Sequence, residues 1–598
     1  MRRRVMSLLP LLALLLAAAV VHPVAACTSF IVGSAASVDG SVLIARNDDG
    51  EGAVSPSSLV YHPAREGPAL LRANLNNLTL TLPAPGFAYW ALPAGPLADA
   101  DKGTNTTGEA AGWNEAGVAV SATESIYNSA AALAADPPNE DTGIIEDVIP
   151  SILLPQATSA RHGAKLLGEA VSKHGAGEAF GVLIADREEV WYLETASGHH
   201  WLAQRVPPDT FFVSANQGRF QEVDLDDEAA TLSSPGLLKH AIRSGLWDPA
   251  SGRPFNFFSA FMRDGVHDTN YSYPRVCLLQ GMWGHFCGQE LRSPALGCRN
   301  VVPKPCDNML RQPVFLKPQP RKLSAQDVMA AMRNHFEGSR HDPYTLQHPE
   351  EPFRPIALLR TGMGHVTRLR PLAGGVPDGL SIITYTAMST PKLSPFIPLY
   401  KGLPGDVLPP ELTAAEYRKP DRVSLFWKAR RLQALVFQDW PALAPAAAQA
   451  IVDWEAKVEA QDRPAMEARY TAAWQAGDAA GATQELVSFT SAALQEAGQL
   501  LEGLAEAAAW QLGLPGMPSD DWLLERLEEA AEMYAFEPTS DDPPPPSCHH
   551  RHHPRRRGDK RPRPCADDSE GEGGSASRSS YEAAGASVLE ALHEAATE

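Results

Sequence analysis

Residues 27–49, CTSFIVGSAASVDGSVLIARNDD, decide the fold of this chain, because they combine a hairpin pattern with a cluster of reactive side chains. Residues 30–32 and 42–45 are β-branched or apolar, and the turn-forming residues 38–41 separate them. Antiparallel pairing returns the end of the second strand to the start of the first. The sequence therefore predicts that residues 46–49, Arg-Asn-Asp-Asp, lie beside the cysteine that opens the stretch.

A pattern typical of a secretory signal precedes this cysteine. Three arginines at residues 2–4 are followed by an apolar run over residues 8–21 and by the small residues 24–26, which suit a signal peptidase. The run is shorter than the ~20 residues of a membrane-spanning helix, so we expect residues 1–26 to be removed. Cys27 then becomes the first residue of a secreted or lumenal protein, in an extracellular, periplasmic or vacuolar/lysosomal compartment.

The composition narrows the class of partner. The chain has 598 residues, with 71 acidic and 51 basic side chains and a net charge of −20. Such a charge repels phosphate backbones, so nucleic acid is not an expected partner. No segment after residue 26 has the pattern of a membrane span, and we expect a soluble globular protein.

The remaining cysteines agree with export. Four of them form a cluster, Cys277, Cys287, Cys298 and Cys306, and two lie in the tail, Cys548 and Cys565. The cluster lacks any C-x-x-C spacing and lies among Pro and Gly residues, so disulfides are favoured over a zinc site. Three sequons, at Asn77, Asn105 and Asn270, predict a glycoprotein if the host is eukaryotic.

Periodicity predicts further elements along the chain. The expected strands are residues 117–122, 180–185, 190–194, 200–206 and 211–215, and residues 143–174 favour helix. Strand pairs separated by helices are typical of layered proteins with helices on the outer faces. Residues 406–536 are rich in Ala, Glu, Leu and Gln at helical spacing, which predicts several long helices. Residues 537–598 have too few apolar side chains to order and are expected to be a disordered tail.

A mature N-terminal cysteine combines a nucleophile with a base. Its α-amine titrates at ~7.7–8.0 and lies within reach of its own thiol, an arrangement that favours acyl transfer through a thioester. Arg46 is the candidate to hold the thiolate or a substrate carboxylate. Asp49 is the candidate to orient the α-ammonium group, with Asp48 an equal rival by spacing. Two other roles for Cys27 stay open here, the lipidated cysteine of a bacterial lipoprotein and one half of a disulfide.

A family resemblance covers most of the chain. Cys27-Thr28-Ser29-Phe30, Asp39-Gly40-Ser41 and Arg46-Asn47-Asp48-Asp49 resemble the opening of the dipeptidase A family, which includes the secernins. Similar blocks follow at residues 113–124, 191–201, 214–217, 333–338, 354–356 and 395–402, so the resemblance spans about residues 27–510. The family consists of N-terminal-nucleophile cysteine hydrolases, distantly related to penicillin V acylase and bile salt hydrolase.

The resemblance implies both a fold and domain boundaries. The fold class is α+β, the four-layer αββα sandwich of N-terminal-nucleophile hydrolases with a C-terminal helical extension. We expect the hydrolase domain at residues 27–405, with a cysteine-rich insertion at about residues 277–312 that forms one wall of the pocket. The helical part then covers residues 406–536.

The resemblance also implies three further site residues. Asn216 is the oxyanion-hole candidate by analogy with the acylases, and Arg275 matches a further arginine near the site. Glu124 occupies the position where those acylases place an oxyanion donor. An ionised carboxylate cannot donate a hydrogen bond, so we expect Glu124 to bind the ammonium group of a dipeptide.

The leading hypothesis is a cysteine-type dipeptidase that hydrolyses short unblocked peptides without metal or cofactor. Its alternatives are an acylase-type amidohydrolase acting on N-acyl amides, and a non-catalytic binding protein that is secreted or lipid-anchored. The presence of Cys27, Arg46, Asp49 and Asn216 together argues against the binding protein, because attack, orientation and oxyanion stabilisation must coexist for a useful rate.

Overall fold

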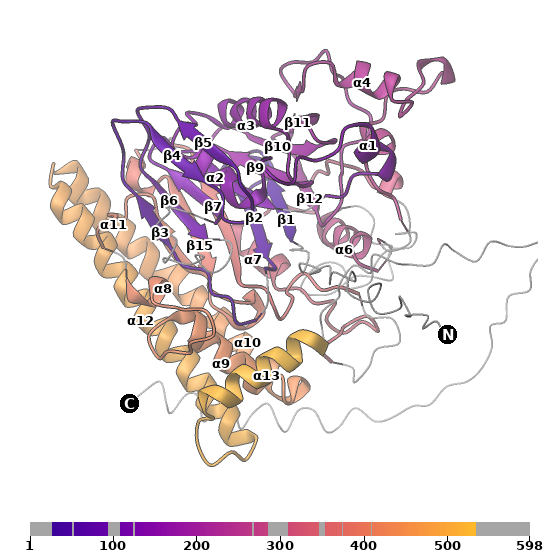
Figure 1. Cartoon of the computed structure of the whole chain (residues 1–598). Coiled ribbons are helices and arrows are strands. Elements are labelled where there is room, and N and C mark those ends of the chain that lie inside the picture. The colour runs from indigo at the N-terminus through magenta and orange to yellow at the C-terminus, as the bar shows by residue number, and fades with distance from the viewer. Residues whose placement is uncertain are drawn as a thin grey trace, which may run out of the picture.

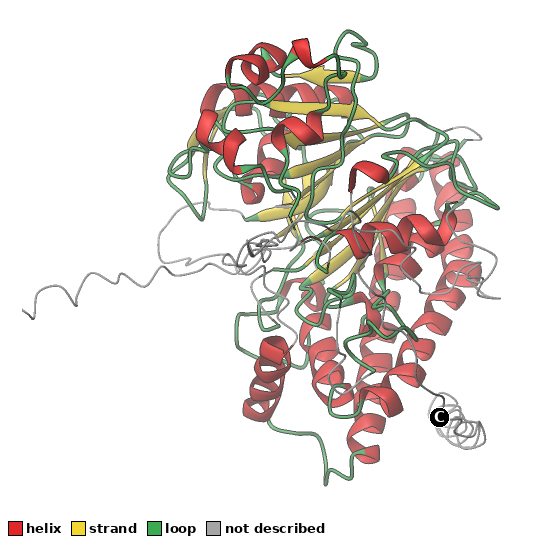
Figure 2. Ribbon diagram, turned by 90° about the vertical axis from the view of Figure 1, so that its right-hand side faces the viewer, coloured by secondary structure: helices red, strands yellow, loops and turns green. Residues whose placement is uncertain are grey.

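The computed structural model describes residues 27–50, 53–93, 108–123, 126–265, 268, 270–284, 309–345, 353–372, 375–407 and 409–533. In this part of the chain two large antiparallel sheets lie between layers of helices (Figure 1, Figure 2). The expected signal peptide, Glu124, Asn105, five of the six further cysteines and the tail after residue 536 lie outside the described residues.

The first sheet has six strands and contains the predicted hairpin. Its order is β12-β1-β2-β14-β15-β16, and every neighbouring pair is antiparallel. The strands are β1 (Thr28–Val32), β2 (Val42–Asp48), β12 (Phe211–Ser214), β14 (Met363–Leu369), β15 (Ile382–Ala387) and β16 (Ile397–Tyr400). The hairpin is thus confirmed, and it lies inside the sheet between β12 and β14.

The turn between β1 and β2 has a local cause. Gly40 has a φ of 80°, in the left-handed region that a residue without a Cβ adopts at little cost. The Asp39 carboxylate accepts hydrogen bonds from the backbone N–H of Ser41, at 3.2 Å, and from its hydroxyl, at 2.8 Å. Asp39-Gly40-Ser41 therefore sets the register that brings Arg46 opposite Ser29.

The second sheet has eight strands in the order β13-β11-β10-β9-β8-β7-β6-β3. They are β3 (Val60–His62), β6 (Tyr89–Pro93), β7 (Glu109–Asn114), β8 (Ala119–Thr123), β9 (Gly181–Ala185), β10 (Val190–Thr195), β11 (Trp201–Arg205) and β13 (Thr231–Ser233). A small ribbon of β4 (Ala69–Arg72) and β5 (Thr79–Leu82) stands apart. The strands expected at residues 117–122, 180–185, 190–194, 200–206 and 211–215 are β8 to β12.

Side-chain alternation along these strands builds the layers. In β10, Val190 and Tyr192 pack into the core shared with the six-stranded sheet, whereas Trp191 and Leu193 pack into a second core under helices. Those helices are α2 (Ile149–Leu153) and α3 (Ala160–His174). This arrangement, with helices also on the far face of the other sheet, agrees with the expected αββα sandwich.

Residues 143–174 do not form one helix. They contain a 3₁₀ turn at Glu146–Val148, then α2, then α3. Pro155 follows the end of α2, and because proline has no backbone N–H it cannot continue the helical hydrogen bonds. Ser159 then restarts the helix, because its side chain accepts a hydrogen bond from the backbone N–H of His162.

Helices on the outer face of the six-stranded sheet complete the fourth layer. α6 (Tyr273–Trp283) covers β12, and α7 (Ala325–Met332) covers β2 and β14. The C-terminal part forms the helices α9 (Leu425–Val436), α10 (Trp440–Lys457), α11 (Arg463–Gln475), α12 (Ala479–Gln511) and α13 (Asp520–Met533), as expected. Among them α12 packs on β16 and α9 on α8 (Pro410–Thr413), and in Figure 1 these helices lie at the lower left of the molecule. No helix of the described residues has the length and apolar character needed to cross a bilayer.

Candidate active site

Cys27 lies at the start of β1, buried between the two sheets. Thr28 pairs with Asn47 and Ser29 with Arg46, so the end of β2 lies beside the cysteine as the hairpin predicted. Residues 27, 29, 46 and 48 share the face that points to the eight-stranded sheet, because side chains alternate along a strand. The thiol is fully buried in this chain, in which residues 1–26 still precede it.

Arg46 connects the thiol to both sheets. Its Nη1 lies 3.7 Å from Cys27 Sγ and also donates to the backbone carbonyl of Ala122 in β8. Its Nη2 lies 3.3 Å from a carboxylate oxygen of Asp48. The guanidinium is therefore fixed in position from three sides, with a cationic group next to the sulfur.

Burial controls the acidity of the thiol. Loss of water raises the pKa of Cys27 to about 12, although the Arg46 guanidinium opposes this rise. The carboxylates of Asp48, Glu146 and Asp49 add to it in that order. At neutral pH the thiol is thus protonated.

Arg275 joins the cysteine to the oxyanion candidate. From the first turns of α6 its Nη1 donates to the Cys27 carbonyl, at 3.1 Å, and to the Thr28 hydroxyl, at 2.9 Å. Its Nη2 donates to Asn216 Oδ1 at 2.7 Å. Burial, and then the neighbouring Arg354, lower its pKa to about 9. The structure therefore places Arg275 at the centre of the site, although its sequence context departs from the family pattern.

Asn216 follows β12 in a left-handed conformation, with a φ of 55°. Asparagine adopts this region more readily than most residues. Ser272 supports the same turn, since its hydroxyl donates to the Asn216 carbonyl at 3.2 Å. Because Oδ1 accepts from Arg275, Nδ2 is the donating end of the amide, which is the atom an oxyanion hole requires.

Asp49 is held by two residues far away in the sequence. Arg354 forms a fully buried ion pair with its Oδ2, and the Thr361 hydroxyl donates to its Oδ1. The structure thus fixes both oxygens of Asp49, whereas the rival Asp48 pairs with Arg46. Sequence reasoning did not assign a role to Arg354 or Thr361, although Arg354 lies in one of the blocks that resemble the family.

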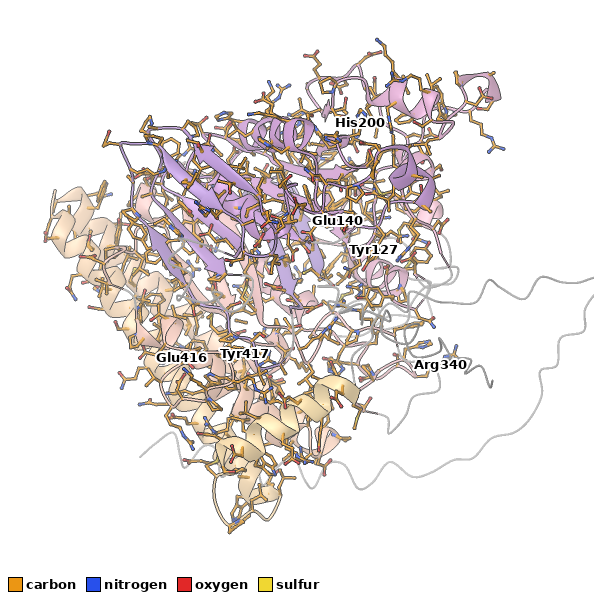
Figure 3. The ribbon with its side chains drawn as sticks, viewed as in Figure 1. Tyr127, Glu140, His200, Arg340, Glu416 and Tyr417 are labelled. Atoms are coloured by element: carbon orange, nitrogen blue, oxygen red, sulfur yellow. The ribbon has the colours of Figure 1, made fainter. Side chains whose placement is uncertain are left out.

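Tyr271 completes the cationic side of the site. The guanidinium carbons of Arg275 and Arg354 lie 5.2 and 4.9 Å from the centre of its ring, within the range of a cation–π contact. A second tyrosine, Tyr127 (Figure 3), stacks on Arg263 at 4.0 Å. Tyr271 thus contacts both guanidinium groups, although Arg354 still lowers the pKa of Arg275.

The charges around Cys27 are closely matched. Three buried arginines and the carboxylates of Asp48, Glu146 and Asp49 lie around the thiol, with the Arg46 guanidinium 3.7 Å from the sulfur. Such a site can stabilise a thiolate, a tetrahedral oxyanion or a carboxylate of a bound molecule. The arrangement brings together Cys27, Arg46, Asp49, Asn216 and Arg275. Glu124, the remaining predicted site residue, lies outside the described residues.

Comparison with known proteins gives a consistent result. A model of peptidase family C69 matches residues 26–452. A probable dipeptidase of Salmonella dublin is 44% identical over 387 residues, which cover 64% of this chain and 83% of that protein. A probable dipeptidase of Latilactobacillus sakei is 32% identical over 449 residues, 73% of this chain and 87% of its own length. A dipeptidase of Bifidobacterium longum is 31% identical over 394 residues, which cover 62% of this chain and 71% of that protein.

Proposed function

We propose, since the chain belongs to peptidase family C69, that this peptidase is a cysteine-type dipeptidase acting on short unblocked peptides. The similar proteins named above carry dipeptidase in their names, and the match extends over most of their length. The observation that carries the mechanism is the position of Arg46, whose guanidinium lies 3.7 Å from the sulfur of a cysteine that directly follows a signal-peptide pattern.

The reaction begins once residues 1–26 are removed. The new α-amine of Cys27, with a typical pKa of ~7.7–8.0, takes the thiol proton directly or through one water. The thiolate attacks the carbonyl carbon of the peptide bond and forms a tetrahedral intermediate. The C–N bond then breaks, the leaving amine takes the proton from the α-ammonium group, and a thioester remains. Water hydrolyses this thioester and restores the thiol.

Two residues stabilise the tetrahedral intermediate in this proposal. Asn216 Nδ2 donates to the oxyanion, and Arg275 holds the Asn216 amide in the required orientation through Oδ1. Arg46 stabilises the thiolate before attack. Each of these groups is already held by a backbone or side-chain partner, so little reorganisation accompanies the reaction.

In this proposal the acidic side chains bind the amino groups of Cys27 and of the substrate. We propose that Asp49 hydrogen-bonds the α-ammonium group of Cys27, because Arg354 and Thr361 hold its carboxylate in one place beside the end of β2. Asp48 is the alternative for this role. Glu124 is proposed to bind the substrate's own ammonium group, and the signal-peptide pattern supports the proposal that the protein is exported.

The test compares three chains on two substrates. Purified wild-type protein, Cys27→Ala and Cys27→Ser are assayed with free dipeptides and with their N-acetylated forms. We expect turnover of the free dipeptides by wild type, none by Cys27→Ala, and a loss of at least about 10³-fold for Cys27→Ser, with unchanged circular dichroism. Full activity of Cys27→Ala would refute the proposal that Cys27 is the nucleophile. Cleavage of the acetylated substrates alone would favour the acylase alternative.

A further inference from the structure

A buried glutamate of the eight-stranded sheet reaches across to the six-stranded sheet. Glu194 lies in β10, on the same face as Val190 and Tyr192, which pack into the core between the two sheets. Its side chain is fully buried. A glutamate is almost never fully buried unless its carboxyl group has partners. The partners of this glutamate lie in the segment that follows β12.

That segment, the oxyanion loop (residues 215–220), carries Asn216. Glu194 Oε1 accepts a hydrogen bond from the backbone N–H of Arg219 at 2.7 Å. Its Oε2 accepts a longer one from the backbone N–H of Phe220, at 3.4 Å. Arg219 and Phe220 are both fully buried. One carboxyl group therefore satisfies two buried donors at the C-terminal end of the loop.

The beginning of the oxyanion loop is held by β12 and by the start of α6. The Ser214 hydroxyl of β12 donates to the Gln217 carbonyl at 3.1 Å, and the Ser272 hydroxyl donates to the Asn216 carbonyl at 3.2 Å. Arg275 of α6 fixes the Asn216 side chain. Glu194 adds a contact from the opposite sheet, so the loop is fixed at both of its ends.

The Arg219 side chain places a positive charge near the Glu194 carboxyl group. Its Nε donates to the Val213 carbonyl at 3.0 Å, and its Nη2 to the Pro313 carbonyl at 2.8 Å. Burial raises the pKa of Glu194 to about 8, whereas the two backbone N–H groups and then the Arg219 guanidinium oppose this rise. We expect a proton on Oε2, which has the longer bond. Oε1 thus accepts from Arg219 in either protonation state.

The position of the oxyanion loop decides where the Asn216 amide lies. Without the Glu194 acceptors, two buried N–H groups would lose their partners, and the loop is expected to move until they find others. A displacement of about 1 Å, even one caused far from the reacting atoms, can lower a rate by about 10²-fold. A small movement of this loop would therefore be visible in the rate.

We propose that Glu194 is a positioning residue, which sets the place of Asn216 from the opposite sheet through the backbone of Arg219 and Phe220. It does not touch the reacting atoms. The inference rests on the proposed role of Asn216 in the peptidase reaction.

Three variants separate the reach of the side chain from its charge. Glu194→Met removes both acceptors at a similar length, and Glu194→Asp keeps the acid but draws its oxygens back by one methylene. Glu194→Gln keeps one acceptor at the same reach. With a free dipeptide we expect kcat to fall by about 10–100-fold in the Met and Asp variants and by at most about threefold in Glu194→Gln, with KM within about twofold of wild type. Wild-type kcat in Glu194→Met, or equal losses in Glu194→Gln and Glu194→Asp, would overturn the proposal.

A double variant shows whether Glu194 acts through Asn216. Glu194→Met combined with Asn216→Gly should have a kcat within about threefold of Asn216→Gly alone, because the donor that Glu194 positions is then already absent. Losses that multiply would show two independent effects and would overturn the proposal.

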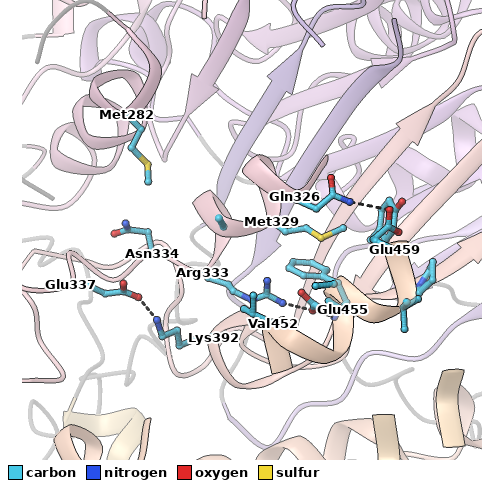
Figure 4. Close-up of a pocket in the computed structure, with 16 residues that line it drawn as sticks. Met282, Gln326, Met329, Arg333, Asn334, Glu337, Lys392, Val452, Glu455 and Glu459 are labelled. Carbon is cyan, nitrogen blue, oxygen red and sulfur yellow. Dashed lines mark hydrogen bonds and ion pairs between the residues drawn. The ribbon is translucent and has the colours of Figure 1, made fainter. Parts of the chain in front are cut away.

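The matched control for lost stability is Glu455→Met. Glu455 of α10 accepts the backbone N–H of Phe396 at 2.6 Å and pairs with Arg333 beside a cavity next to α7 (Figure 4). The described lining of that cavity includes none of the residues placed in the active site. Glu455→Met should therefore lower the melting temperature at least as much as Glu194→Met and keep kcat within about twofold of wild type. A loss of kcat that follows the melting temperature in both variants would overturn the proposal.

Hydrogen exchange tests the contact without any reaction. At one pH, the amides of Arg219 and Phe220 should exchange at least about tenfold faster in Glu194→Met than in wild type, and as in wild type in Glu455→Met. Unchanged exchange in Glu194→Met would overturn the proposal by itself. Full activity of Cys27→Ala or of Asn216→Gly would instead refute the proposed reaction, and the exchange rates would still decide whether Glu194 holds the loop.

Discussion

At the scale of single residues, Asn216 provides the sharpest test of oxyanion stabilisation. Asn216→Asp keeps a residue type that tolerates its φ of 55° but replaces the Nδ2 donor by an acceptor. We expect kcat for a free dipeptide to fall by about 10²–10³-fold, the usual loss for one oxyanion-hole donor. Asn216→Gly is the control, because it relieves the backbone and also lacks the donor. Equal activity of wild type and Asn216→Gly would contradict the role of Asn216 in stabilising the oxyanion.

The thiol of Cys27 makes a prediction about pH. In the uncleaved chain burial raises its pKa from 9.0 to about 12. At pH 8 about one thiol in ten thousand is then ionised, compared with about one in ten at the ordinary value, and the fraction rises tenfold per pH unit. Alkylation of Cys27 by iodoacetamide, followed by peptide mass spectrometry, should therefore stay slow in the uncleaved chain up to pH 10. Alkylation that saturates near pH 8 would contradict the burial argument.

At the scale of elements, helix α9 holds the loop that carries Thr361. Arg430 is fully buried, and its guanidinium donates to the carbonyls of Leu359, at 2.6 Å, and Thr361, at 2.9 Å. Burial lowers its pKa to about 9. Thr361 in turn bonds Asp49. A C-terminal helix thus positions a residue of the candidate active site, and Arg430 is a positioning residue.

Arg430→Met tests this connection. Loss of the guanidinium leaves buried carbonyls unpaired, so we expect a loss of about 3 kcal/mol in the free energy of unfolding, measured with urea. The pH profile of kcat should also shift, since Asp49 loses its fixed position. Arg431→Met on the same helix is the matched control, because Arg431 bonds Asp520 and Asp421 instead. A shift of the pH profile in both variants alike would contradict the role of Arg430.

The elements also show which parts of the fold were predictable. The β1–β2 hairpin and β8 to β12 follow from local patterns, because turn residues and apolar runs occur next to each other in the sequence. No strand was expected over residues 363–400, where β14, β15 and β16 complete the sheet. Polar residues such as His365, Thr367 and Thr384 are buried between the sheets in hydrogen-bonded pairs, so these strands lack a clear apolar pattern.

The same distinction applies to the site. The neighbours of Cys27 in the hairpin, Arg46 and Asp48, could be predicted from strand pairing. Arg354 and Thr361 reach Asp49 across more than 300 residues, a contact that no local pattern encodes. Asn216 and Arg275 were assigned only by family resemblance, and their hydrogen bond is visible only in the fold.

At the scale of the whole molecule, the C-terminal helices share one core with the sheets. Trp427, Leu486 and Leu494 belong to the same buried cluster as Phe30 and Ile44. The boundary near residue 405 therefore does not divide two cores. We expect one cooperative thermal transition for residues 27–533 by calorimetry, and an insoluble product when the chain stops at residue 424. Two separate transitions would show independent units instead.

The central claim is that Cys27 acts with its own free α-amine. The most direct measurement combines intact mass with activity on a series of chains that begin at Cys27 or carry one extra glycine before it. The account predicts that dipeptide turnover follows the fraction of molecules that begin with an unmodified Cys27, because an added residue converts the amine to an amide. Equal turnover by the chain with the extra glycine, or by one with an acylated Cys27, would contradict it.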